Sequence, residues 1–232
     1  GGLYWFFVLR APVPEVVEES PIPTPTATPS PDLSSVLAGL ESQTFCTASG
    51  CTAADFNSNI SNGTITGGQL KKIYLSENDT SGNIAEVLDL LGVAYPAQLK
   101  GSLGSDSSVL MYGQTEAFDS KGFIVTSAPV EKRLIFISEI KDASLANQEV
   151  AGWELTMATN LQELFDLVSN KPSDQDFLDT NYSGTAIRYK NFPWPDKSID
   201  YSMVSAVNGK SYLVITNSRE SMYSALDKLK GL

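Results

Sequence analysis

The sequence predicts an α+β fold in which helices pack on one face of an antiparallel sheet, preceded by an extended N-terminal segment. Short segments rich in β-branched and aromatic residues indicate strands, and Asn208-Gly209 between two of them favours a hairpin turn. Apolar residues three and four positions apart indicate helices. The stretches 132–154 and 210–229 resemble each other, by duplication or by chance, because each runs from a strand into an amphipathic helix. A hairpin before each suggests two similar ββα units.

The first half of the folded part is predicted to mix short helices and strands. Asp32 follows Pro31 and is a suitable N-cap, so a short helix should begin there and cover 32–42. Residues 43–68 are rich in Ser, Thr, Asn and Gly, which favours loops with one short helix or strand at most. The apolar spacing then predicts a strand at 69–77, a helix at 81–92, a short helix at 96–103, and strands at 107–115, 121–129 and 131–139.

The second half is predicted to hold the longest helix and a C-terminal ββα unit. That helix should cover 141–168, with Asp142 as its N-cap. Its apolar face comprises Val150, Trp153, Met157, Leu161, Leu164 and Val168. Strands are predicted at 184–192, 198–207 and 210–217, followed by a helix at 218–232. The apolar face of this last helix comprises Met222, Ala225, Leu226 and Leu229.

Composition divides the chain into three parts. Residues 1–10 form an apolar segment, and residues 11–31 hold seven of the 12 prolines together with Thr and Glu. This Pro-rich part cannot form a core, so we expect an extended linker of polyproline II character that reaches about 65 Å at about 3.1 Å per residue. Residues 32–232 hold all the predicted strands and helices, and we expect them to form an extracytoplasmic domain.

The composition argues against several classes of function. The formal net charge is −11 at pH 7, and an acidic surface repels the phosphate groups of nucleic acids and anionic lipids. The chain has no histidine, which excludes Ser-His-Asp and Cys-His catalysis and every His-containing metal site. No cofactor or metal is predicted. An enzyme of this composition would have to be a hydrolase that works with carboxylates alone.

Cys46 and Cys51 are the two cysteines of the chain, and Ser49-Gly50 lies between them. Because this spacing allows a tight turn that brings the two sulfurs together, we predict a disulfide in an oxidising compartment. Closing so short a loop stabilises a fold by about 2 kcal/mol. Two reduced thiols are the alternative, and a metal site would lack further soft ligands.

Two polar stretches invite a binding function and also have simpler interpretations. In the acidic run 173–184, Asp174, Asp176 and Asp179 do not have the spacing of a calcium-binding EF-hand loop, so a solvated loop is predicted there. The stretch 188–195 mixes basic and aromatic residues, which can stack on a sugar or a base. The same alternation also describes a strand with one buried face that ends at the prolines.

The opening stretch GGLYWFFVL can be interpreted in two ways. As a helix it would be about 13 Å long, which is shorter than the roughly 30 Å of bilayer hydrocarbon, so it would be the outer end of a longer membrane span. As a strand it would extend for about 30 Å, and its aromatic and β-branched residues favour strand formation. A free apolar strand on a long linker could then complete the sheet of a neighbouring copy.

The stretches LDLLGVAYPAQLKGSL and SLANQEVAGWELTMATNLQELF, together with the apolar segment and the Pro-rich linker, resemble uncharacterised single-pass, stalked cell-surface proteins of small-genome bacteria. The resemblance covers most of residues 80–230. It implies a cell-surface location and no particular activity.

These observations together predict a non-enzymatic cell-surface protein, a subunit of a pilus-like extracellular filament whose partners are other copies of itself. The residues expected to pack into a neighbouring subunit are Leu3, Tyr4, Trp5, Phe6, Phe7, Val8 and Leu9. The alternative is a monomeric interaction or sensor domain on a single-pass membrane stalk, anchored through the same segment. Nucleic acid is not expected as a partner under either interpretation.

Overall fold

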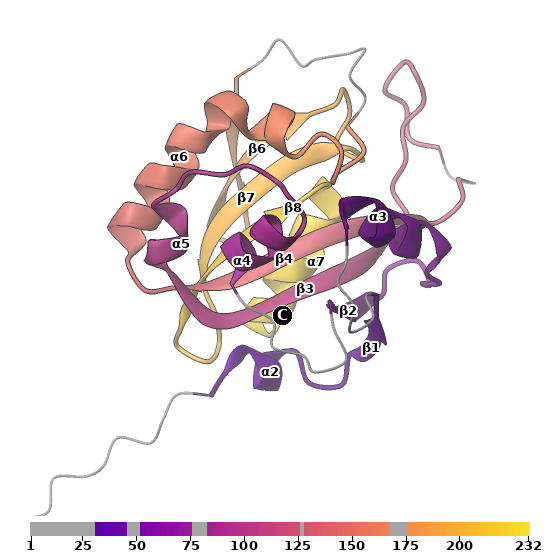
Figure 1. Ribbon diagram of the computed structural model, residues 1–232. Helices are drawn as coiled ribbons and strands as arrows, with labels where there is room; N and C mark the ends of the chain where they lie inside the picture. The colour runs from indigo at the N-terminus through magenta and orange to yellow at the C-terminus, as the bar shows by residue number, and fades with distance from the viewer. Residues whose placement is uncertain (1–30, 46–51, 76–82, 126–127, 168–175) are drawn as a thin grey trace, which may run out of the picture.

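The computed structural model describes residues 31–45, 52–75, 83–125, 128–167 and 176–232. These residues form one sheet with helices packed against it (Figure 1). The strands are β1 (Glu41–Thr44), β2 (Leu70–Tyr74), β3 (Leu103–Gln114), β4 (Glu131–Ile140), β5 (Leu178–Tyr182), β6 (Thr185–Asn191), β7 (Ser198–Ser205) and β8 (Ser211–Thr216). The helices are α2 (Leu33–Val36), α3 (Ala53–Asn62), α4 (Ile84–Leu90), α5 (Leu99–Ser102), α6 (Ala143–Asn160) and α7 (Arg219–Lys230). The predicted α+β class is confirmed.

The eight strands lie in the order β1-β2-β3-β4-β8-β7-β6-β5. Two antiparallel pairs, β3 with β4 and β7 with β8, meet in the middle of the sheet, where β4 pairs with β8. Gly209 has a φ of 80° in the turn before β8, as the Asn208-Gly209 pair predicts. The sheet is mixed and not purely antiparallel, because β1 pairs in parallel with β2.

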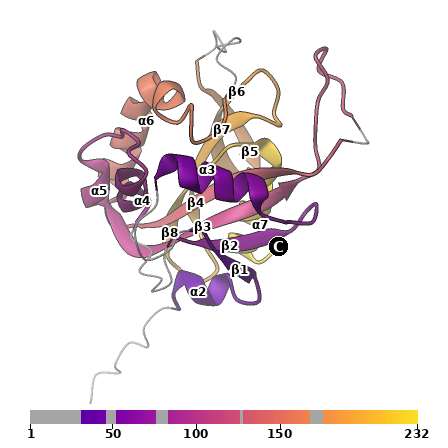
Figure 2. The same cartoon turned by 45° about the vertical axis from the view of Figure 1, so that its right-hand side comes forward.

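The sheet is buried on both faces, which corrects the prediction that helices pack on one face. Leu134 and Phe136 of β4 belong to a core shared with α3, α4 and α6, whereas Ile135 and Ile137 belong to a core shared with α2 and α7. Figure 1 shows α4 and α6 in front of the sheet and α7 behind it, and Figure 2 shows α3 on the same side as α4. Consecutive side chains of a strand point to opposite faces, so four apolar residues in a row need cover on both sides. The two ββα units therefore place their helices on opposite faces.

The first helix starts at its predicted cap and is shorter than predicted. Asp32 Oδ1 accepts a hydrogen bond from Ser35 N at 3.1 Å, as an N-cap does. Gly39 then adopts a φ of 79°, which is outside the helical range, and Glu41 begins β1. The segment 41–44 was predicted as the end of a helix and the start of a loop, and it becomes a strand because β2 lies beside it.

The longest helix also starts at its predicted cap and ends early. Asp142 Oδ1 accepts a hydrogen bond from Leu145 N at 3.0 Å. The helix ends at Asn160, and successive turns carry Leu161 and Leu164 into the core that α6 covers. The apolar spacing continues past the helix because residues in turns reach the same core, so spacing alone could not place the helix end.

The strand predicted at 121–129 is wrong for the residues that the structure describes. In that stretch Ile124 forms an isolated bridge with Phe118, and the side chains of Phe123 and Ile124 are 67% and 62% exposed. Residues 126–127 lie outside the described part. A segment with alternating apolar residues forms a strand only where a partner strand and a core lie beside it. This loop instead projects away from the sheet (Figure 1).

Gly113 of β3 allows the strand to pass close to the turn before β2. Gly68 N donates to Gly113 O at 2.8 Å, and Gly113 N donates to Gln69 O at 3.0 Å. A Cβ atom at position 113 would lie 2.1 Å from Thr66 O, a backbone atom. We therefore expect Gly113→Ala to lower the free energy of unfolding by about 3 kcal/mol in urea titrations. Gly101→Ala, where a Cβ meets nothing within 4 Å, is the control and should not be destabilised. Equal stability of the two variants would contradict this expectation.

Candidate functional site

The residues that the sequence singled out for disulfide formation and assembly lie outside the described part of the chain. These residues are Cys46, Cys51, Leu3, Tyr4, Trp5, Phe6, Phe7, Val8 and Leu9. Their roles remain predictions. Among the residues that are described, no three Cys, Asp or Glu side chains gather in a way that would hold a metal ion. The helices formed by the described residues are too short or too polar to cross a bilayer.

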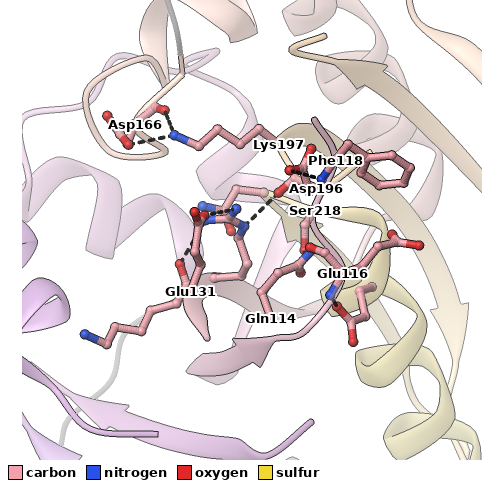
Figure 3. Close-up of polar contacts among 12 residues, drawn as sticks. Gln114, Glu116, Phe118, Glu131, Asp166, Asp196, Lys197 and Ser218 are labelled. Carbon is pink, nitrogen blue, oxygen red and sulfur yellow. Dashed lines mark hydrogen bonds and ion pairs between the residues drawn. The ribbon is translucent and has the colours of Figure 1, made fainter. Parts of the chain in front are cut away.

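A cleft of about 450 Å³ lies at the end of the sheet where β4 begins, and we call it the polar cleft. It is bordered by α3, by residues 130–134, by the turns after α6 and by Asn217. Asn217 Oδ1 accepts a hydrogen bond from Leu134 N at 2.7 Å, which ties the end of β8 to β4. Figure 3 shows the charged side chains that surround this region.

Arg133 is the buried charge beside the polar cleft, with 6% of its surface exposed. It forms an ion pair with Glu131, and its Nε donates to Asp196 O at 2.8 Å. Asp196 Oδ2 in turn accepts a hydrogen bond from Phe118 N at 3.2 Å (Figure 3). The guanidinium therefore joins the start of β4 to the loop before β7, which is a structural role.

Two lysines fasten further segments around the polar cleft. Lys132 Nζ donates to Ser61 O of α3 at 2.6 Å. Lys197 Nζ lies 2.9 Å from Asp166 Oδ2 in the turn after α6, and this pair is drawn in Figure 3. These contacts hold together segments that are far apart in sequence. Lys132 and Lys197 thus help to close one end of the domain.

The first turn of α7 is anchored to the loop after β3. The carboxylate of Glu220 accepts hydrogen bonds from Thr115 N at 2.9 Å, Glu116 N at 2.7 Å and Tyr112 Oη at 2.9 Å. Burial raises the pKa of Glu220, but the hydroxyl of Thr115, which also donates to this carboxylate, and the other donors outweigh burial and bring the pKa below its usual value. Arg219 forms an ion pair with Glu116 in the same region.

A second pocket, of about 130 Å³, lies beside the N-terminal end of α7, and we call it the aspartate pocket. It is lined by Thr180, Tyr189, Asn191, Pro195, Asp200, Arg219 and Tyr223. Asp200 is 3% exposed, and its Oδ1 has no hydrogen-bond partner among the described residues. Burial raises the pKa of Asp200 to about 7, although the nearby hydroxyl of Ser198 and the charge of Arg219 favour the ionised form.

The basic and aromatic stretch 188–195 is a strand whose side chains are divided between the two faces. On the α6 face, Arg188 Nε and Nη2 donate to the two carboxylate oxygens of Glu154 at 2.8 and 2.7 Å. Tyr201 Oη donates to the same carboxylate at 2.6 Å. On the other face, Tyr189 lines the aspartate pocket. The strand interpretation is confirmed, and the strand ends at Asn191, before the prolines.

The acidic run predicted as a solvated loop contains the edge strand β5, which corrects that prediction. In the described part of the chain β5 pairs with β6 alone. The side chain of Asp179 is 81% exposed, with Oδ1 lying 3.1 Å from Arg188 Nη1. The carboxylate therefore stays in solvent as predicted, while the backbone forms a ladder with β6. Asp174 lies outside the described residues.

Sequence reasoning missed the aspartate pocket, although one signal was present. Asp200 is an acidic residue inside a strand that is predicted at 198–207. Acidic residues are seldom buried without a partner, so an aspartate in a buried strand indicates a special environment. Its neighbours in the pocket come from β5, β6 and α7, which the sequence does not bring together. Features of the described structure that suit a function include the polar cleft, the aspartate pocket and the outer edge of β5. Comparison of the chain with protein-family models, with curated proteins and with solved structures finds no match.

Proposed function

We propose that this chain is a non-enzymatic, extracytoplasmic structural protein, a subunit of a pilus-like filament at the cell surface. In this proposal, the apolar segment 3–9 of one copy adds as a strand to β5 of a neighbouring copy. The observation that carries the proposal is the outer edge of β5, which has one strand partner in the described part of the chain. Such an edge offers a row of backbone donors and acceptors to another strand.

The turn between β5 and β6 indicates which backbone groups face outwards. Ser183 and Gly184 have φ values of 48° and 78°, which is the pattern of a two-residue type I′ turn. In such a turn the flanking residues, Tyr182 and Thr185, form a hydrogen-bonded pair. Non-hydrogen-bonded and hydrogen-bonded pairs then alternate along the ladder. The N–H groups of Asp179 and Asn181 should therefore point away from β6, towards an added strand.

The apolar segment suits this edge in length and in composition. Residues 3–9 read LYWFFVL and carry no charge, and aromatic and β-branched residues favour strands. Seven residues extend for about 23 Å, which exceeds the about 17 Å of the five residues of β5. The Pro-rich linker, with its expected reach of about 65 Å, is long enough to deliver the segment to another copy. The other edge strand, β1, is shorter and pairs in parallel.

The cations around the polar cleft support a structural role. Arg133, Lys132 and Lys197 each bind a backbone carbonyl of another segment. Such contacts hold loops in place and leave the cations less free to act on a substrate. The proposal therefore includes no enzymatic activity.

The first test is deletion of residues 1–10, with assembly measured by electron microscopy and sedimentation velocity in the absence of detergent. The full chain should form regular fibres, and the truncated chain should remain monomeric with an unchanged circular dichroism spectrum. Fibres from the truncated chain would refute the assembly role. Single particles from the full chain, or aggregates that detergent disperses, would instead support a domain on a membrane stalk.

The second test locates the docking edge. Asp179→Pro removes an outward N–H group at an edge position, where proline is tolerated. Asp179→Ala removes the same carboxylate and keeps the N–H group, so it is the matched control. Fibre yield should fall strongly with Asp179→Pro and stay normal with Asp179→Ala. If Asp179→Pro assembles normally while the deletion does not, the segment packs elsewhere and the β5 assignment is wrong.

A further inference from the structure

Two buried polar atoms in the described part of the chain have no hydrogen-bond partner, Ser198 Oγ and Asp200 Oδ1. Both belong to β7 and lie two positions apart, so they point to the same face of the sheet. A buried carboxylate oxygen without a partner is unfavourable, and native structures keep such groups rarely. The hydroxyl of Ser198 lies close enough to favour the ionised form of Asp200. Asp200 Oδ1 still lacks a donor among the described residues, so it is a place where a donor from outside the chain can bind.

The aspartate pocket gives that donor a place to enter. Asp200 lies on its wall together with the rings of Tyr189 and Tyr223. Tyr189 is the residue of β6 directly opposite Asp200 in the ladder. The ring of Tyr223 is stacked on that of Tyr182 with centroids 3.9 Å apart, which holds it in place. Aromatic rings beside a carboxylate form a favourable environment for an organic cation.

The charge of the pocket also favours a cation. Arg219 lines the pocket, but its guanidinium is paired with Glu116 and lies 5.8 Å from the ring centroid of Phe118. Arg219 and Glu116 neutralise each other, so an ionised Asp200 leaves one negative charge at this site. A divalent metal ion would need several oxygen ligands with more charge, and the described residues hold no group of three acidic side chains placed to bind one.

We propose that the aspartate pocket binds a primary ammonium group carried on a short alkyl chain. The ammonium donates to Asp200 Oδ1, and the alkyl chain lies against the rings of Tyr189 and Tyr223. The pocket volume of about 130 Å³ equals that of about four water molecules at about 30 Å³ each, which suits a chain of about four carbons. A free alkylamine and the end of a lysine side chain share this chemistry. The proposal does not depend on filament assembly.

The test is an NMR titration of the full chain with n-butylammonium chloride, and with n-butanol as the neutral analogue. The wild type should show saturable shifts with the amine and none with the alcohol. Asp200→Asn should bind the amine at least about tenfold more weakly, because it removes a hydrogen bond to a charged group. Glu163→Gln, which makes the same change of charge at the polar cleft, should bind like the wild type.

A second readout uses the wild type alone, so it does not depend on the folding of any variant. Nuclear Overhauser effects should connect the butyl protons to the rings of Tyr189 and Tyr223. Nα-acetyl-lysine amide distinguishes the two sources: competition with n-butylammonium assigns the pocket to a lysine side chain, and its failure to compete assigns it to a free amine. Absence of saturable binding, equal binding by Asp200→Asn, or contacts to other residues would overturn the proposal.

Discussion

The free energy of unfolding of Asp200→Asn should rise relative to that of the wild type as the pH increases. The difference between the two chains should favour the variant by about 3 kcal/mol more at pH 7 than at pH 4. Burial raises the pKa of Asp200 to about 7 in the folded chain, whereas an unfolded aspartate titrates near 3.9. Between these values the folded state holds a proton that the unfolded state releases. The free energy of unfolding of the wild type therefore falls as pH rises through this window, by about 1.4 kcal/mol per pH unit. Asparagine has no such proton, so its variant lacks this decline.

The groups that face Asp200 set the size of this effect. The hydroxyl of Ser198 and the charge of Arg219 favour the ionised form and reduce the pKa shift, and Glu116 forms an ion pair with Arg219. Tyr189 of β6 and Tyr223 of α7 line the same pocket. Urea unfolding of both chains in a series of buffers from pH 4 to pH 8 measures the difference. Parallel stability curves for wild type and variant would show that Asp200 titrates as an ordinary carboxyl.

Trp153→Ala should lower the free energy of unfolding by about 4 kcal/mol, because it leaves a large cavity in the core under α6. The side chain of Trp153 is 2% exposed and packs in the core that contains Val150 and Met157. Its Nε1 also donates to Asn160 Oδ1 at 2.9 Å, near the end of the helix. Domains of this size are stable by only about 5 to 15 kcal/mol, so the loss should be visible as a much lower urea midpoint.

Leu155→Ala is the matched control for this experiment. Leu155 lies in the same helix and is 92% exposed, so its truncation removes almost no buried surface. We expect a change within about 0.5 kcal/mol. If the two variants lose similar stability, α6 does not depend on its buried face and the packing described for this core is wrong.

The tests of stability and of function are linked at Asp200. A group whose charged form is disfavoured by burial destabilises the domain at neutral pH, and a cation bound beside it would relieve that effect. Wild-type chain should therefore be stabilised by the amine that the aspartate pocket is proposed to bind, whereas Asp200→Asn should not.

Local patterns in the sequence determined most of the helices and strands. Asp32 and Asp142 mark helix starts because a short acceptor side chain caps nearby N–H groups, which needs no tertiary context. The stripe of Met222, Ala225, Leu226 and Leu229 predicts α7 because these residues lie on one side of any helix. The sequence did not predict the strand Leu178–Tyr182, because its polar side chains indicate a loop. The segment is extended because it pairs with β6.

Only the tertiary structure decided which faces are covered and which groups meet. Ile135 and Phe136 are equally apolar in sequence, and the packing of α7 on one side and α6 on the other assigns them to different cores. Likewise Asp200, Arg219 and Thr180 come from separate elements, and the strand order together with the packing of α7 brings them into one pocket. The physical reason is range: capping and amphipathic spacing act over a few residues, whereas burial, edge exposure and pocket chemistry depend on contacts between residues far apart along the chain.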